Sequence, residues 1–322
     1  GEINNYLSRF FSAGFYYKTF MGIPPFEWGR GTSIWMFFEK FIRQAAGMGK
    51  ISNMPDPDCY EHANDFCDLL IVGSGPSGIA AAKEAADKNL DVILVEQDNL
   101  LGGNQLSEDN FSIENLYNEL KSLNIRIMQR TTAFGLYDNC VLGLLERVTD
   151  HLPFPHKDLP RQRFWTIRAK HVIVGSGSLE RHIAFNNNDI PGVMTANAAK
   201  HYLNRYGVLT GKNIVITTNN DSVYHTAELL SKAGSKVTVL DARSEINLET
   251  NPNQNIQIKF GKVPYNINGS REIKSLDIAD INNLPFKKID NIPCDQVLMS
   301  GGWSPVVHLL SHRGVRPKWN AE

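Results

Sequence analysis

Three glycines at a fixed spacing carry the clearest chemical signal in this sequence. Gly73, Gly75 and Gly78 form a G-x-G-x-x-G pattern directly after the apolar run of residues 68–72. The first glycine allows a tight turn out of a strand, the second lets backbone N–H groups approach a pyrophosphate, and the third allows close helix–sheet packing. A helix that starts here presents free N–H donors and a partial positive charge to an anion. The pattern predicts a dinucleotide site; a glycine-rich turn of another α/β fold is the alternative.

A carboxylate follows at the distance at which such a site holds a ribose. The helix-forming run 79–88 leads to a second apolar strand at 92–95, and Glu96 closes that strand 18 residues after Gly78. A carboxylate at this position hydrogen-bonds ribose hydroxyls and would repel a 2′-phosphate. We therefore expect NAD, or the adenosine half of FAD, rather than NADP.

A second unit repeats this architecture without the glycines. Residues 213–217 and 236–240 read as strands around a helix at 222–233, and Asp241 closes the second strand as Glu96 closes the first. Side chains at the glycine positions would hold a pyrophosphate away from the backbone. The second unit is therefore expected to keep the fold and to lack the ordinary nucleotide site, unless another loop geometry still binds. The residues aligned with the three glycines are Thr218, Asn220 and Val223.

These elements predict an α/β protein with two Rossmann-like dinucleotide-binding domains of the glutathione-reductase type. The strand at 170–174, which ends at Gly175, is expected to return beneath the phosphates. The strand at 295–300 is expected to bring the chain back to the first domain, so that the second domain is an insertion. The expected ranges are 1–66 for an N-terminal segment, 67–195 with 293–322 for the split first domain, and 196–292 for the second domain.

The N-terminal segment is rich in aromatic residues. Apolar side chains recur at helical spacing over residues 34–46, which predicts an amphipathic helix. Charged residues interrupt the pattern and argue against membrane insertion. The apolar face fits either packing against the rest of the chain or a subunit interface, and both interpretations stay open.

Composition excludes several classes of protein. The chain has 322 residues, 42% of them hydrophobic and 21% charged, which suggests about two folded domains at roughly 150 residues each. With a net charge of −1 and no apolar run long enough to span a bilayer, neither a nucleic-acid nor a membrane partner is expected. The four cysteines form no C-x-x-C pair, so reduced thiols, no metal site and a cytoplasmic location are expected. The chain starts with glycine rather than methionine, as expected of a processed or excised piece.

Several further stretches resemble the α subunits of heterotetrameric sarcosine oxidases, within the wider group of amine-oxidising flavoproteins with two dinucleotide folds. They extend over nearly the whole chain, and the first and last are far more specific than the glycine pattern. The stretches are 12–21 (SAGFYYKTFM), 43–47 (RQAAG), 68–78, 101–103 (LGG), 130–138 (RTTAFGLYD), 219–224 (NNDSVY) and 300–308 (SGGWSPVVH).

The resemblance implies a set of cofactors and a partner. NAD is expected at the first site, with FAD as the alternative, and FMN is expected at the interface with a β subunit. That partner would be an amine-oxidising flavoprotein with its own FAD, and the complex would oxidatively demethylate a secondary amine such as sarcosine. Together with the glycine pattern, the resemblance gives the expected cofactor-binding residues Gly73, Ser74, Gly75, Pro76, Ser77, Gly78, Glu96, Gln97, Asp98, Gly103, Asn104, Thr132, Ala133 and Gly175.

The sequence departs from that family in length and offers no catalytic set of its own. The family's α subunit also carries a ferredoxin-like segment and a folate-binding aminomethyltransferase-like domain. Most of the first and all of the second are absent from this sequence, so folate chemistry is not carried over. His201 and His308 stand in apolar surroundings and read as structural residues. No C-x-x-x-x-C follows Gly103, which argues against a dithiol relay.

Two rival functions stay open. One is an autonomous FAD-dependent NADH oxidoreductase, against which the altered second unit counts. The other is a non-catalytic scaffold subunit that binds an adenine nucleotide.

Overall fold

The computed structural model describes residues 52–318 apart from 109–110, 155, 157 and 245–255, together with residues 40, 41, 43, 44 and 47. The chain divides into two compact units, residues 1–57 and 58–322. Of the helix predicted at 34–46, residues 40, 41, 43 and 44 are described and are helical; the rest of it, with most of the aromatic segment 1–66, lies outside the described residues. All helices and strands discussed below lie within residues 58–322.

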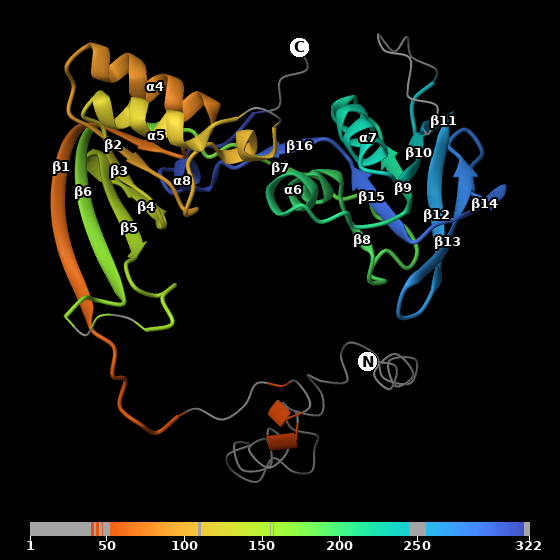
Figure 1. Ribbon diagram of the computed structural model, residues 1–322, viewed down its shortest axis with the longest axis horizontal. Helices are drawn as coiled ribbons and strands as arrows, with labels where there is room; N and C mark the ends of the chain where they lie inside the picture. Colours follow the sequence, from red (N-terminus) through yellow and green to blue (C-terminus); the bar gives the residue numbers. More distant parts are fainter. Residues whose placement is uncertain are drawn as a thin grey trace. The chain divides into compact units, whose positions relative to one another are not determined.

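The first sheet has six strands and is built around the glycine turn. β1 runs parallel to β2 and β6, and β2 runs parallel to β3, whereas β5 is antiparallel to both β6 and β4. Val72 pairs with both Val95 and Val174, so β1, β2 and β6 end at the same edge. In order across the sheet (Figure 1), the strands are β3 (Arg126–Met128), β2 (Val92–Val95), β1 (Tyr60–Val72), β6 (Gln162–Val174), β5 (Val141–Arg147) and β4 (Thr131–Tyr137).

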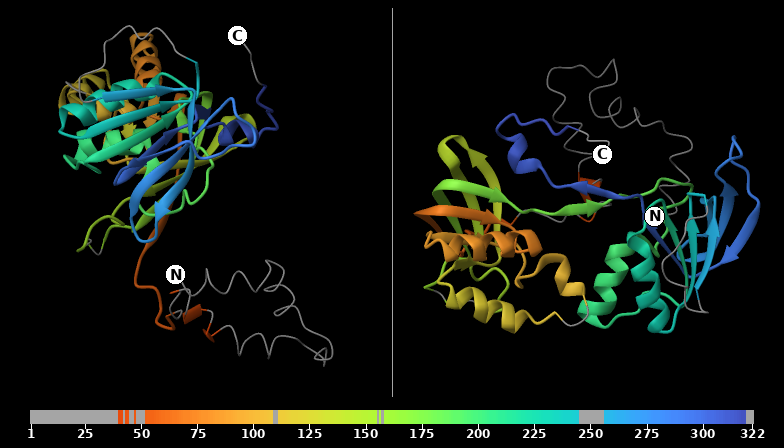
Figure 2. Two further views of the ribbon diagram at one scale, coloured as in Figure 1. Left: turned by 90° about the vertical axis from the view of Figure 1, so that its right-hand side faces the viewer. Right: turned by 90° about the horizontal axis from the view of Figure 1, so that it is seen from above.

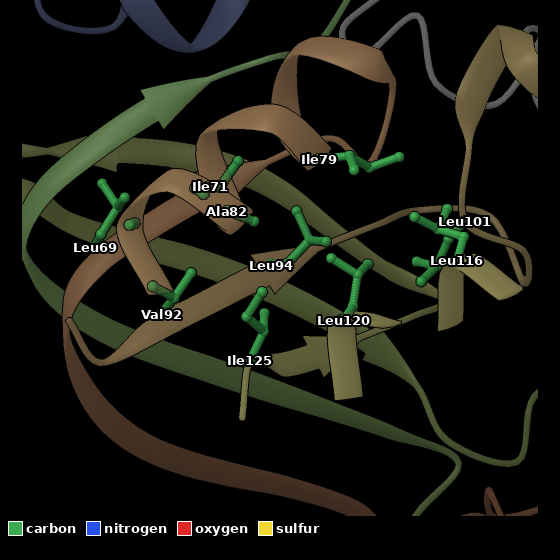
Figure 3. Packing of buried hydrophobic residues seen from close by; sticks show 11 residues of the cluster. Leu69, Ile71, Ile79, Ala82, Val92, Leu94, Leu101, Leu116, Leu120 and Ile125 are labelled. Carbon is green, nitrogen blue, oxygen red and sulfur yellow. The ribbon is translucent and has the colours of Figure 1, made fainter. Parts of the chain in front are cut away.

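Two helices cover one face of this sheet. α4 (Pro76–Asp87) follows the glycine turn and α5 (Ile113–Ser122) precedes β3. Because successive strand residues point to opposite faces, Leu69 and Ile71 pack under the helices, whereas Leu70 contributes to the core on the other face. Figure 3 shows the helix-side core, formed by Leu69, Ile71, Ile79, Ala82, Ala85, Val92, Leu94, Leu101, Leu116, Leu120 and Ile125.

The second sheet repeats the plan with five parallel strands. α6 (Ala196–Tyr206) and α7 (Ser222–Lys232) pack on one face. A three-stranded antiparallel sheet packs on the other face and shares a core with Val215, Leu240 and Val297. The five strands, in order, are β11 (Ile256–Phe260), β10 (Lys236–Asp241), β9 (Asn213–Thr218), β15 (Gln296–Ser300) and β8 (Val193–Thr195); the smaller sheet comprises β12 (Lys262–Gly269), β13 (Ile273–Asp280) and β14 (Asp290–Pro293).

The domain boundaries differ from those expected. The strand predicted at 295–300 does not return to the first sheet: Val297 of β15 pairs with Val215 of β9 and with Val193 of β8. Both β8 and β15 therefore belong to the second sheet, although they lie outside the range 196–292 expected for the second domain. β1 begins at Tyr60, before the start expected at residue 67, and pairs with β6 from its first residue.

The chain reaches the first domain again only after β15. β16 (Trp303–Pro305) pairs with β7 (Ser178–Glu180) in a two-stranded ribbon, and the short helix α8 (His308–Ser311) follows. Leu309 of α8 is buried in the same core as Leu136 and Ala169, on the face of the first sheet opposite α4 and α5. Two short 3₁₀ helices, η1 (Gly103–Ser107) and η2 (Asp138–Cys140), complete the first domain.

Candidate functional site

A cavity of about 630 Å³ lies where β1, β2 and β6 end. This volume is in the range of small-molecule and cofactor sites. The ends of parallel strands are also where open α/β sheets bind ligands. Eleven of the predicted cofactor-binding residues line the cavity, namely Gly73, Gly75, Pro76, Ser77, Glu96, Gln97, Gly103, Asn104, Thr132, Ala133 and Gly175.

Two of the three motif glycines are required by close backbone contacts. Gly73 has a φ of +97°, and a Cβ there would lie 2.3 Å from the carbonyl oxygen of Gly175. A Cβ on Gly78 would lie 1.9 Å from the carbonyl oxygen of Gly73, so this glycine lets the first turn of α4 approach the end of β1. Gly78 does not line the cavity. Its role is the close packing that the sequence predicts for it.

Gly75 is different, because its missing side chain leaves room for a ligand. Its backbone, with φ −69° and ψ 179°, is open to any residue, and a Cβ there would meet no atom within 4 Å. Gly75 is also the N-cap of the 12-residue helix α4, and within the described part of the chain no side chain caps this end. The N–H groups of the first turn are therefore available to an anion in the cavity.

The Glu96 carboxylate sits at the cavity wall and is oriented by hydrogen bonds. Oε2 accepts from the backbone N of Ser74 at 2.9 Å and from its Oγ at 2.6 Å. Oε1 accepts from the backbone N of Asp98 at 2.9 Å. Each carboxylate oxygen has two lone-pair sites, so one site on Oε1 remains for a ribose hydroxyl. Ser74 is fully buried and does not line the cavity, so its place is behind Glu96.

Asp98 also lies outside the cavity lining, because its carboxylate is held by the second domain. Arg205 of α6 donates from Nη1 at 2.7 Å and from Nη2 at 3.0 Å. The Arg205 hydrogen bonds hold the pKa of Asp98 below its usual value. The neighbouring carbonyl of Gln97 accepts from Nη2 of Arg147 at 2.7 Å, which fixes the same loop from another side.

The cavity also includes residues that the sequence does not predict. The C-terminal segment adds Val306, His308, Leu309 and His312, and the turn after β6 together with the start of β7 adds residues 176–179. His308 was expected to be structural in apolar surroundings, but it is exposed and lines the cavity. The sequence signal for the turn was the glycine pair around Ser176. No comparable sequence pattern predicts that α8 lies at the cavity, because only the folding of the chain brings this helix there.

In the second Rossmann-like domain, the counterpart of Glu96 is already bonded by side chains of the same domain. The Tyr224 hydroxyl donates to Oδ2 of Asp241 at 2.7 Å, and Arg243 donates to the same oxygen at 2.7 Å. Arg243 also forms an ion pair with Asp221 at 2.7 Å, and Asp241 is completely buried. Asn220, where the motif would need a glycine, donates to the Ser300 carbonyl. These contacts agree with the expected loss of the ordinary nucleotide site.

Redox-active thiols and metal clusters are not part of the described site. All four cysteines are free thiols. Burial raises the pKa of both Cys67 and Cys294 to about 12, which leaves these two thiols protonated and unreactive. Among the described residues, no group of three or more His, Cys, Asp or Glu side chains could hold a metal ion. In the same residues, no helix has the length and apolar character needed to cross a bilayer.

Comparison with known proteins agrees with this geometry. Residues 67–321 match the family described as pyridine nucleotide-disulphide oxidoreductase. A solved structure of L-proline dehydrogenase from P. horikoshii superposes with a TM-score of 0.59 at 20% identity, covering 81% of this chain and 47% of that one. At this identity the likeness concerns the fold. Together these comparisons confirm the predicted α/β fold with Rossmann-like domains.

The curated relatives confirm the resemblance noted in the sequence. Sarcosine oxidase subunit alpha of Rhizobium meliloti (strain 1021) is 38% identical, over 100% of this chain and 32% of the relative. The subunit of the same name from Corynebacterium sp. (strain U-96) is 33% identical, over 85% of this chain and 30% of the relative. The chain thus spans about a third of the length of these relatives.

Proposed function

Because this chain belongs to the pyridine nucleotide-disulphide oxidoreductase family, we propose that it is the nucleotide-binding core of a sarcosine-oxidase-like α subunit. Its first Rossmann-like domain binds one dinucleotide, which we propose to be NAD. The complete assembly would be an oxidoreductase acting on CH–NH donors, which oxidatively demethylates a secondary amine such as sarcosine. The similarity to sarcosine oxidase α subunits over the whole chain supports this assignment.

The observation that carries the proposal is the open Gly75 position beside the Glu96 carboxylate. The N–H groups at the start of α4 would hold the pyrophosphate, since nothing occupies the place of a Gly75 side chain. Glu96 would accept a hydrogen bond from a ribose hydroxyl, and its charge disfavours a 2′-phosphate. Gly103, Asn104, Thr132 and Ala133 line the same cavity and would border the remaining parts of the nucleotide. When bound, NAD supplies a hydride-accepting nicotinamide, and the protein supplies its position and electrostatic surroundings.

The proposed partner is an amine-oxidising flavoprotein β subunit, with FMN at the interface between the two chains. Its support is the resemblance to proteins that are named as subunits. In this arrangement the present chain contributes one wall of the FMN site. Amine oxidation itself would take place on the partner.

The autonomous FAD-dependent NADH oxidoreductase is a weaker candidate. It would need a second dinucleotide site for NADH, and the second unit is the natural place for one. There the Tyr224 and Arg243 side chains already satisfy Asp241, the counterpart of Glu96. A nucleotide ribose would have to break this buried network before it could bind.

The proposal is tested by identifying what the purified protein carries. The protein is denatured, and the released small molecules are separated and identified by mass spectrometry, alongside a visible absorption spectrum before denaturation. NAD released from the first site supports the proposal, and FAD with bleaching by NADH would instead support the autonomous reductase. Co-purification with an amine-oxidising flavoprotein, together with sarcosine-dependent reduction of the complex, separates the enzyme subunit from a scaffold.

A further inference from the structure

Helix α6 of the second domain contacts both loops that border the nucleotide cavity of the first domain. One loop follows β2 and contains Glu96, Gln97 and Asp98. The other contains η1, whose first residues Gly103 and Asn104 line the cavity. Figure 2 shows α6 beside the segment that contains η1, and the hydrogen bonds described below join them.

The contact with the first loop is a short chain of hydrogen bonds that ends on the ribose-binding carboxylate. Arg205 donates two bonds to the Asp98 carboxylate, at 2.7 and 3.0 Å. The backbone N of Asp98 then donates to Oε1 of Glu96 at 2.9 Å. The Arg205 side chain is only 17% exposed, so water competes weakly for this paired geometry.

The contact with the second loop is centred on Ser107, which is almost fully buried. Asn204 donates from Nδ2 to the Ser107 carbonyl at 2.7 Å, and the Ser107 hydroxyl lies 2.7 Å from Nδ1 of His201. Lys200 forms an ion pair with the adjacent Glu108. Three side chains of one helix, Lys200, His201 and Asn204, thus hold the segment that begins at the cavity wall.

The helix itself is firmly fixed at both ends. Thr195 caps its N-terminus by accepting from the backbone N of Ala198. Gly207, in the left-handed conformation with φ 65°, ends it with paired bonds back to the last turn. The second domain is not expected to bind a nucleotide of its own. Its support of the two loops at the first cavity is a reason for the chain to keep this domain.

We propose that α6 is a clamp that sets the dinucleotide affinity of the first domain, with Arg205 as a positioning residue that acts through Asp98 on Glu96. The inference rests on the proposed function, because it requires a dinucleotide in the cavity lined by Glu96. Linkage is reciprocal, so a bound nucleotide must also strengthen the contact between α6 and the two loops.

A double-mutant cycle tests the clamp with NAD as the probe. The dissociation constant of NAD is measured by calorimetry for the wild-type full chain, Arg205→Gln, Asp98→Asn and the double variant. We expect Arg205→Gln to weaken binding at least about fivefold, the lower range of usual coupling between sites. The double variant should be no weaker than the weaker single variant, because both changes break the same chain of bonds. Additive losses would overturn the claim that Arg205 acts through Asp98.

Arg163→Gln is the matched control. Like Arg205, Arg163 makes two bonds to carboxylate oxygens, here one to Glu61 at 2.7 Å and one to Glu146 at 3.1 Å, and its side chain is 24% exposed. It lies at the start of β6, away from the cavity. Its loss should lower the melting temperature and leave both the NAD affinity and the NAD-induced melting shift unchanged. An Arg205→Gln variant that behaves in this same way would reduce Arg205 to a structural residue and overturn the proposal.

Asn204→Ala supplies a second route if Arg205→Gln does not fold. It removes one bond to the Ser107 carbonyl and leaves the Arg205 pair in place. A weaker NAD affinity in this variant supports the clamp, and an unchanged affinity contradicts it. Wild-type protein that binds no NAD would reject the proposed function itself, an outcome distinct from normal binding that is insensitive to α6.

Discussion

The hydroxyl of Ser74 lies 2.6 Å from Oε2 of Glu96, although Ser74 is completely buried behind the cavity wall. The same hydroxyl accepts from the backbone N of Gly102 at 3.2 Å. Ser74 therefore joins the glycine turn, the Glu96 carboxylate and the Gly102–Gly103 loop. Ser74 was expected to touch the cofactor, but its side chain lies behind the cavity wall, where it orients Glu96, the residue proposed to hold the ribose.

Replacing Ser74 by alanine should weaken nucleotide binding without removing any contact to the nucleotide. The variant loses a hydrogen bond to a charged group, worth about 1.5 kcal/mol or more, while the backbone N of Ser74 still donates to Glu96. Urea unfolding should show a loss of this size, and calorimetry should show a higher dissociation constant. Equal affinities for wild type and S74A would mean that Glu96 keeps its orientation unaided.

Replacing Glu96 by glutamine should relax the preference for NAD over NADP. The variant keeps the shape of the side chain and removes the charge that would face a 2′-phosphate. Two like charges about 4 Å apart interact by ~1–4 kcal/mol, depending on their exposure to solvent, so the NADP-to-NAD affinity ratio should rise at least about fivefold. Competition binding with both nucleotides measures the ratio. A ratio that stays at the wild-type value would place the ribose away from Glu96.

Two glycine variants should separate binding from folding. Gly75→Val adds a side chain in open space with an ordinary backbone conformation, so nucleotide retention should be lost for a stability cost of about 1 kcal/mol at the helix cap. Gly73→Ala places a Cβ 2.3 Å from a backbone carbonyl at a φ of +97°, so it should destabilise the whole domain. Thermal melting and nucleotide extraction from both variants test this contrast. Retention of nucleotide by a folded G75V protein would show that the site lies elsewhere.

The contact of α6 with Ser107 should weaken in mild acid because of His201. Burial lowers the pKa of His201 below 6.5, and the nearby Arg205 and Lys200 lower it further, against opposing effects of Asp98 and Glu108. The unfolded chain then binds more protons than the folded one as pH falls below about 6.5, so the stability contributed near neutral pH is lost through this window. Denaturant unfolding between pH 5 and 8, compared with His201→Asn as the non-titrating control, measures the effect. Parallel pH profiles for the two proteins would contradict it.

The glycine turn, the helix start and the acidic residue of the first site could be predicted from the sequence, because each has a local physical cause. The turn at Gly73 needs a positive φ, the helix after Gly75 needs room for a ligand, and Glu96 closes a four-residue buried strand. The second Rossmann-like domain could be predicted for the same reason, since β9, α7 and β10 repeat the apolar strand–helix–strand pattern of the first.

The parts that the sequence did not predict depend on contacts between distant segments. All five residues of β15 are buried, and such a strand reads the same whichever sheet accepts it. The first half of β1 is polar and exposed, so only its pairing with β6 defines it as a strand. His308 and Arg205 reach the cavity and its loops from other elements, and no spacing in the chain reports that proximity.

The network of Tyr224, Asp241 and Arg243 makes the decay of the second unit hard to reverse. Thr218, the counterpart of Gly73, lies outside the set of residues with positive φ, so the turn itself has been rebuilt. Restoring the glycines alone would leave a buried acid still neutralised by its own arginine and tyrosine. To create a second dinucleotide site in this chain, the Tyr224 and Arg243 bonds to Asp241 would have to be removed before the glycines are restored. The same order would hold for a site that evolved from this sequence.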